Sequence, residues 1–194
     1  NIYNTHNHTI EDYKQAISDI KKSDKSFYRV ATLDNFMYNL GLFMGYNSIN
    51  YFYSINSSLY QKLSDDLQNS KGSTNLEIGT FDNRIKINSL LGAKYYVTGS
   101  KINLYGYDLE KRYKNNTYVY KNNNSASFAS LFTECISEDD YNKLSSLEKE
   151  DALLKYYVSS KCRKGNYENK SIKKVEFKSK YKIKNKLKLD KKTR

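Results

Sequence analysis

The stretch from Asn88 to Thr98 constrains the fold most, because the pattern of its apolar residues changes there from helical to extended. The apolar residues around its start suit one side of a short helix that Asp82 could cap and that Gly92 would end as a left-handed residue. These residues are Ile85, Ile87, Leu90 and Leu91. The run from Lys94 onward is mostly aromatic or β-branched, which predicts a strand. A helix followed at once by a strand indicates an α+β domain.

Further helices are predicted on both sides of this stretch. Apolar residues recurring every three or four positions predict a helix of about three turns, and they are Ile10, Tyr13, Ile17 and Ile20. A second helix is expected after Ser57, burying Leu59, Tyr60, Leu63 and Leu67. A short helix should follow Ser137, and another should follow Ser145 with a capping box to Glu148. This last helix is expected to align Leu147, Leu154, Tyr157 and Val158.

Strand patterns predict a small, mainly antiparallel sheet. The predicted strands are 27–33, 94–98, 102–109 and 117–121. The last three are expected to form a meander, in which each strand pairs with the next along the chain. Val119 between Tyr118 and Tyr120 is typical of a strand that packs on both faces. The region 34–53 is rich in aromatic residues but has no sustained period, so we expect irregular backbone with room for a short helix.

The net charge of +12 lies entirely in the last segment of the chain. Residues 161–194 hold 15 Lys or Arg and 3 Asp or Glu, whereas residues 1–160 hold 18 basic and 18 acidic side chains. We therefore divide the chain into a neutral α+β body, 1–160, and a basic arm, 161–194, which is expected to pack on the same domain.

Within the arm, lysines alternate with other residues from Val175 onward, which is the period of a strand. Its lysine face could contact an anionic polymer, a lipid surface or a nucleic acid. The lysines are Lys178, Lys180, Lys182, Lys184, Lys186 and Lys188. The alternative is an edge strand that its lysines guard against pairing with other chains. Nucleic acid is the least favoured partner, because the tyrosines that could stack on bases lie in the neutral body.

No catalytic or cofactor-binding group of residues stands out. His6 and His8 are the only histidines, and zinc sites need three or four convergent ligands. We therefore expect neither a metal site nor a Ser-His-Asp triad. Acidic pairs such as Asp65 with Asp66 suit helix ends and polar faces, and no Gly-rich phosphate loop is present in the sequence.

The two cysteines, Cys135 and Cys162, flank the pair of short helices. They could form a disulfide if the chain folds outside the cytoplasm, or they could remain buried thiols. Intact mass with and without a reductant distinguishes the two states. No window approaches the ~18 uninterrupted apolar residues of a membrane helix, because asparagines interrupt the most apolar region, 36–60.

Several segments, taken in order, resemble the soluble part of YfhO-like bacterial membrane proteins. The most specific is Leu90-Leu91-Gly92-Ala93-Lys94-Tyr95-Tyr96-Val97. The others are Phe27-Tyr28-Arg29-Val30, Gly45 to Ser54, Tyr105-Gly106-Tyr107, Val119-Tyr120-Lys121-Asn122 and Ile136 to Leu154. The sequence departs from the family pattern at Ser127 and Ala129, where the family usually has a proline and a glycine.

The resemblance implies the extracytoplasmic domain of a multi-pass cell-membrane protein similar to C-type glycosyltransferases, which take sugars from polyprenyl-phosphate carriers. The family is linked to glycosylation of cell-wall polymers such as lipoteichoic acid in Gram-positive bacteria. In C-type enzymes the catalytic carboxylates typically lie in an early loop next to the membrane, so the resemblance implies a non-catalytic segment without a cofactor. The implied partners are its own transmembrane region, the nearby membrane surface, and a cell-wall polymer or polyprenyl-phosphate sugar.

Under this reading, the segment 45–56 is our candidate surface for sugar or polymer. Its tyrosines could stack on sugar rings, and its asparagines offer amide donors and acceptors. The candidate residues are Tyr46, Asn47, Asn50, Tyr51, Tyr53 and Asn56. The alternative is that these tyrosines only pack the core and its interfaces. Two other functions stay open: a structural domain that docks on its own membrane helices or a partner, and a basic protein that binds nucleic acid.

Overall fold

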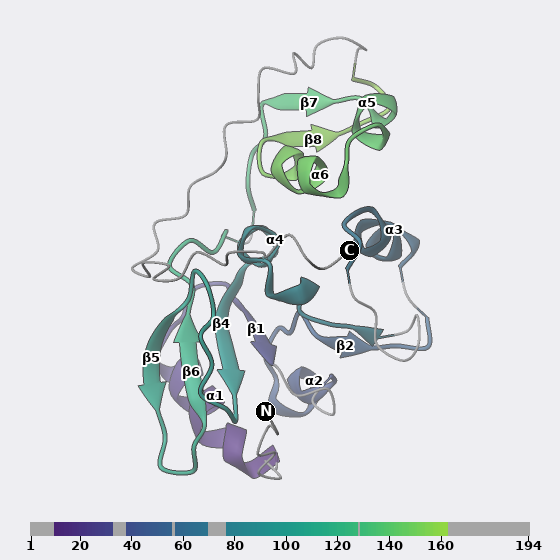
Figure 1. Cartoon of the computed structure of the whole chain (residues 1–194). Coiled ribbons are helices and arrows are strands. Elements are labelled where there is room, and N and C mark those ends of the chain that lie inside the picture. Colours follow the sequence, from purple (N-terminus) through teal and green to yellow (C-terminus); the bar gives the residue numbers. More distant parts are fainter. Residues whose placement is uncertain (1–9, 33–37, 56, 70–76, 128, 163–194) are drawn as a thin grey trace, which may run out of the picture.

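The computed structural model describes residues 10–32, 38–55, 57–69, 77–127 and 129–162, and its elements confirm the α+β class (Figure 1). The helices are α1 (Ile10–Ser23), α2 (Leu40–Met44), α3 (Ser58–Asp66), α4 (Ile85–Leu90), α5 (Glu138–Asn142) and α6 (Ser146–Leu153), with a short 3-10 helix, η2 (Phe81–Asn83). The strands are β1 (Arg29–Thr32), β2 (Tyr51–Phe52), β3 (Glu77–Ile78), β4 (Ala93–Thr98), β5 (Asp108–Arg112), β6 (Tyr118–Lys121), β7 (Glu134–Ile136) and β8 (Tyr156–Val158).

The main sheet has the strand order β1-β4-β6-β5 and is mixed. β1 pairs with β4 in parallel, whereas the β4–β6 and β5–β6 pairs are antiparallel. The predicted meander is therefore wrong, because β6 and not β5 lies beside β4. β5 forms the outer edge of the sheet, as Figure 1 shows.

The strand predicted at 102–109 begins only at Asp108. The hydroxyl of Tyr120 accepts a hydrogen bond from the backbone N–H of Ile102 and donates one to the Ile102 carbonyl, both at 2.9 Å. One side chain thus satisfies this backbone without a neighbouring strand. Gly106 then turns the chain with φ +81°.

The main sheet buries side chains on both faces, and α1 covers one of them. The helix predicted over residues 10–20 is confirmed; Tyr13, Ala16, Ile17 and Ile20 pack with Val30, Tyr95, Val97 and Val119. A tyrosine-rich cluster fills the other face, with Tyr96, Tyr107, Tyr118, Tyr120, Ile49 and Ile85. The alternation predicted around residue 119 is therefore also confirmed.

The central stretch folds as predicted, with α4 leading directly into β4. Gly92 adopts the left-handed conformation, with φ +73°. The cap prediction is wrong, however. Asp82 lies inside η2 with φ 52°, and Arg84 occupies the N-cap position of α4.

The helix predicted after Ser57 is α3, but one of its predicted core residues is wrong. Leu59 is 77% exposed. The buried stripe is centred on Ser64 and Leu67, with Tyr60 and Leu63 packing beside it. Leu59 lies one position round the helix from this stripe, because successive helical residues are about 100° apart.

Residues 134–162 form a small module that packs its own apolar cluster, drawn at the top of Figure 1. β7 and β8 pair in parallel, and α5 and α6 connect them. The predicted caps are present: the Ser137 hydroxyl accepts from the Asp140 N–H, and Ser145 forms a capping box with Glu148. The helix expected to reach residue 158 is wrong, since α6 ends at 153, residues 157 and 158 belong to β8, and Leu147 is 74% exposed.

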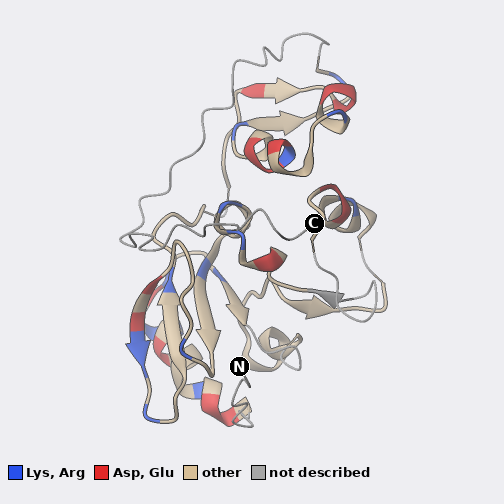
Figure 2. Ribbon diagram, in the orientation of Figure 1, with Lys and Arg blue, Asp and Glu red and all other residues tan. Residues whose placement is uncertain are grey.

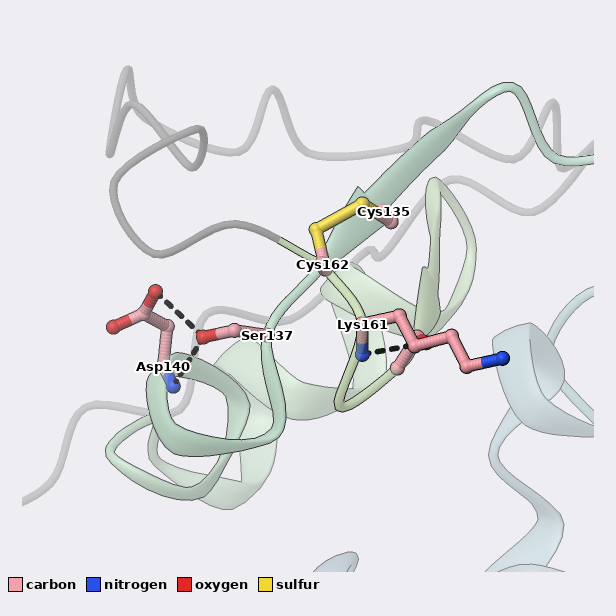
Figure 3. Close-up of a disulfide and its surroundings, with 6 residues drawn as sticks. Cys135, Ser137, Asp140, Lys161 and Cys162 are labelled. Carbon is pink, nitrogen blue, oxygen red and sulfur yellow. Dashed lines mark hydrogen bonds between the residues drawn. A yellow bond between two sulfur atoms is a disulfide. The ribbon is translucent and has the colours of Figure 1, made fainter.

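A disulfide between Cys135 and Cys162 joins the two ends of this module, with a Cα–Cα distance of 6.0 Å (Figure 3). The two cysteines are 27 positions apart in the sequence. A loop of this length stabilises a fold by about 3.5 kcal/mol in the chain-entropy description.

Several predictions fall outside the described residues. These are the basic arm with its lysine face from Lys178 to Lys188, the His6 and His8 pair, and Asn56. None of the helices in the described ranges combines the length and the hydrophobicity that a membrane-spanning segment requires.

Candidate ligand-binding cavity

The chain between α2 and β2 runs beside β1 and carries most of the candidate residues. Gly45 ends α2 in the left-handed conformation, with φ 65°. The next residues then bond to β1, with the Val30 N–H donating to the Asn47 carbonyl at 2.8 Å and the Ile49 N–H donating to the Val30 carbonyl at 3.2 Å. The segment therefore lies along the free edge of the main sheet.

Two asparagine side chains fix this segment by bonding to backbone as a neighbouring strand would. Asn50 accepts from the Thr32 N–H at 3.0 Å and donates to the Thr32 carbonyl at 2.9 Å. Asn39 makes the same pair of bonds to the backbone of Phe52, both at 3.0 Å. Both amides are thus occupied by the fold, so Asn50 positions the segment instead of offering its amide to a ligand.

A cavity of about 300 Å³ opens between α2, this segment and β2. It brings together five of the six candidate residues: Tyr46, Asn47, Asn50, Tyr51 and Tyr53. Six further residues line it that the sequence did not single out: Arg29, Tyr38, Asn39, Gly41, Leu42 and Ser48. Gly41 is needed for this close packing, because a Cβ there would lie 2.8 Å from the Tyr46 carbonyl oxygen.

Aromatic rings form one wall of the cavity. The rings of Tyr51 and Tyr53 lie 5.0 Å apart between centroids with an interplanar angle of 37°, and Tyr51 also contacts Tyr60 at 5.4 Å. Tyr53 is 42% exposed. Burial and the neighbouring Tyr53 raise the pKa of Tyr51, so its hydroxyl is neutral and can donate a hydrogen bond. Such a wall offers ring surface and hydroxyl groups to the cavity.

The hydroxyl of Tyr46 is buried and has no hydrogen-bond partner among the described residues. Burial raises its pKa, which keeps it protonated. A buried polar atom without a partner is unfavourable by about 1–3 kcal/mol. An unpaired hydroxyl on a residue that lines a cavity is a candidate for a ligand or water contact.

The cavity also carries a positive charge from the half-buried Arg29. Its guanidinium donates one hydrogen bond, to the Leu91 carbonyl at 2.5 Å, and lies 5.0 Å from the ring centroid of Phe27. No carboxylate in the described ranges forms an ion pair with it, and no Asp or Glu of those ranges lines the cavity. The sequence did not mark Arg29 as a candidate site residue. The absence of an acidic partner depends on the folded arrangement and cannot be read from neighbouring residues in the chain.

Other cavities in the described ranges are larger. One, of about 520 Å³, contains Lys155 and Glu134, which lie 3.2 Å apart. Another, of about 570 Å³, contains the pair of Lys111 and Asp19, which lie 2.6 Å apart, together with Lys22 and Glu110. A third, of about 420 Å³, is lined by lysines of α1 and the turn after it. The cavity at Arg29 differs from these three in combining a cation with several tyrosine rings.

The chemistry available in the Arg29 cavity is that of binding. Its lining residues supply ring faces, hydroxyls, amides and one guanidinium, and among the described residues no His, Cys, Asp or Glu lines it. Nor do those residues contain a group of three or more His, Cys, Asp or Glu that could hold a metal ion.

The family model described as bacterial membrane protein YfhO matches residues 3–194. No curated protein and no solved structure shows significant similarity.

Proposed function

Because the chain belongs to the YfhO family of bacterial membrane proteins, we propose that it is an accessory domain that helps to bind or position a cell-wall polymer of the lipoteichoic acid type. The polymer would be presented to a membrane-embedded glycosyltransferase centre elsewhere in the same protein. The observation that carries this proposal is the cavity at 46–53, in which tyrosine rings and a cation lie together, with no Asp, Glu or His among the described residues that line it.

The proposed location is the extracytoplasmic side of the cell membrane. The disulfide between Cys135 and Cys162 supports it, because disulfides persist in oxidising compartments and are rare in the cytoplasm. The test is to tag the complete membrane protein within this segment and to add protease outside intact cells of its own host. Loss of the tag would support the location, and protection of the tag in intact cells would overturn it.

Binding is tested by retention of purified lipoteichoic acid on the immobilised chain. Replacing both Tyr51 and Tyr53 with Ala should reduce retention at least about tenfold, since an aromatic contact contributes about 1 kcal/mol or more. Tyr51→Phe keeps the ring that packs on Tyr60 and should retain most of the binding. Tyr105→Ala removes a half-exposed tyrosine outside the cavity and serves as the matched control. Unchanged retention in a folded double variant would refute the proposal.

A second candidate function is docking on the lipid surface around the membrane segments of the whole protein. In its favour, Leu42 and Phe43 of α2 are 66% and 79% exposed. A groove of about 420 Å³ beside them is lined by four lysines of α1 and the turn after it: Lys14, Lys21, Lys22 and Lys25. Exposed apolar groups next to lysines fit an anionic lipid surface. Elsewhere on the described elements, acidic and basic residues are interspersed (Figure 2).

This second candidate is tested by flotation with lipid vesicles. The chain should float with phosphatidylglycerol vesicles and much less with phosphatidylcholine vesicles. The Phe43→Ser and Lys22→Glu variants should each weaken flotation several-fold, whereas Leu131→Ser, which removes an even more exposed apolar residue elsewhere, should leave flotation unchanged. Equal flotation of all variants would rule this surface out.

A further inference from the structure

The guanidinium of Arg29 has the features of an anion-binding group. It forms one hydrogen bond, to a neutral backbone carbonyl, so its charge is not compensated by a carboxylate in the described ranges. None of its other N–H groups is a buried donor without a partner, which leaves them accessible at the surface of the cavity. A guanidinium presents five N–H donors in a rigid plane and suits two-oxygen acceptors.

The surroundings of Arg29 hold this plane in place. The Leu91 carbonyl fixes one nitrogen, and the Phe27 ring lies 5.0 Å from the guanidinium carbon. The β1–β4 pairing is irregular at this position, since Arg29 faces Ala93 while Val30 faces Tyr95. Irregularities of this kind redirect a side chain out of the regular alternation of a strand. A pre-oriented arginine loses less entropy when it binds a ligand.

The positive charge of Arg29 also acts on the tyrosines that form the aromatic wall of the cavity. Burial and Tyr51 raise the pKa of the Tyr60 hydroxyl, and the positive charge of Arg29 acts in the opposite direction. Tyr60 packs on Tyr51, which lines the same cavity as Arg29. The cation and the rings of Tyr51 and Tyr53 are therefore parts of one site.

We propose that this cavity binds an anionic saccharide or polyol, with Arg29 pairing with a phosphate or carboxylate group while Tyr51 and Tyr53 contact the neighbouring ring or polyol. The inference rests on the proposed function, because it names the chemical class of the ligand at the same site. It adds to the proposed function the group that recognises the negative charge of the ligand, namely the guanidinium of Arg29.

The experiment is isothermal titration of the complete chain with three oligomers of similar length: a glycerol phosphate oligomer, an oligogalacturonate and neutral maltoheptaose. Both anionic oligomers should bind more tightly than the neutral one, and the stronger of the two identifies phosphate or carboxylate as the preferred group. Arg29→Gln should weaken anionic binding about 10- to 100-fold and leave neutral binding within about twofold. Arg112→Gln, which removes the same charge outside the cavity, should leave all three affinities within about twofold.

Arg29→Lys separates ligand binding from a structural role of the Leu91 contact. Lysine keeps the charge and can still donate to the Leu91 carbonyl, but it lacks the planar fork, so this folded variant should bind anionic oligomers with intermediate affinity. Anionic binding that is unchanged in both Arg29 variants, or that falls together with neutral binding, overturns the inference. If the inference about Arg29 is overturned but Tyr53→Ala still weakens binding, the proposed function remains supported without a role for Arg29. No binding of any oligomer to the wild-type chain overturns both.

Discussion

At the residue scale, side-chain amides and hydroxyls in this chain often replace backbone partners. Asn39, Asn50 and Tyr120 each bond to both the N–H and the carbonyl of one backbone residue. Buried backbone groups must be paired, and these side chains pair them where no strand is available. The many asparagines and tyrosines therefore build the fold as well as the candidate site, which is why composition alone cannot separate the two roles.

Gly106 provides a sharp test of packing at this scale. A Cβ there would lie 2.4 Å from Ile85 Cγ1, and the backbone has φ +81°. We expect Gly106→Ala to lower the free energy of unfolding by more than about 2 kcal/mol, from backbone strain and overpacking together. Gly79→Ala is the matched control, because a Cβ at Gly79 would meet nothing within 4 Å. Urea denaturation measures both, and equal effects would contradict this account.

Asp24 should make stability depend on pH. Although burial acts to raise its pKa, hydrogen bonds from Lys94, Ser26 and Tyr95 hold the pKa of this carboxyl well below its usual range. A depressed folded pKa means that the stabilisation is present above the unfolded pKa of about 4 and is lost as pH falls below it toward the folded value. Asp24→Asn should therefore lower unfolding free energy at pH 7 by about 1–3 kcal/mol, with a smaller difference from wild type at pH 2.5. A difference independent of pH would refute this.

At the scale of elements, the sequence predicted those whose burial follows one regular period. The helix α1 and the strands β4 and β6 are of this kind, since their apolar residues face one helix stripe or alternate across the sheet. Prediction failed where side chains replaced strand partners, as at Ile102, and where the chain order of strands differs from their order in the sheet. Strand order depends on long-range pairing, which local patterns do not contain.

The candidate site was predicted in part for the same physical reason. The aromatic and amide residues of 46–53 lie close together in the chain, so the local richness in Tyr and Asn identified them as candidates. Arg29 and Asn39 lie outside that run and join the cavity only through β1 and α2. Their roles depend on pairing across the fold, and no local spacing signals it.

The disulfide module should lose stability as a unit when its bridge is removed. Cys135→Ser with Cys162→Ser should destabilise β7 and β8 by about 3.5 kcal/mol, because the module has only a small apolar cluster of its own. Hydrogen exchange resolves the effect by element. Amides of β7 and β8 should exchange faster, whereas those of β4 and β6 should keep their protection. Equal loss in both sheets would show that the chain unfolds as a single cooperative unit.

At the scale of the whole molecule, charged pairs connect the disulfide module to the rest of the chain. Lys149 of α6 lies 2.8 Å from Asp66 of α3, and Arg84 lies 3.4 Å from Glu150. Lys86 also pairs with Asp151. Glu150 is 8% exposed at its side chain, so its charge is largely removed from water. Removing Glu150 leaves the guanidinium of Arg84, whose side chain is 22% exposed, without its carboxylate partner.

We therefore expect Glu150→Ala to lower the free energy of unfolding by about 3 kcal/mol. Lys143→Ala provides the comparison, because its pair with Asp140 is exposed and should contribute less than about 1 kcal/mol. Thermal or urea unfolding measures both variants. Similar effects of the two substitutions would mean that burial of the Arg84–Glu150 pair is unimportant for stability.

The parallel pairing of β1 with β4 also affects the order in which the growing chain can fold. Arg29 cannot pair until Ala93 has been synthesised, and β4 cannot pair with β6 until Lys121 has been synthesised. Chains emerge from the ribosome amino end first, and distant pairings form slowly. The helix α1 and the strand β1 therefore stay exposed to proteases and chaperones until β4 has been synthesised, whereas the module closed by Cys135 and Cys162 can fold last from a short local segment.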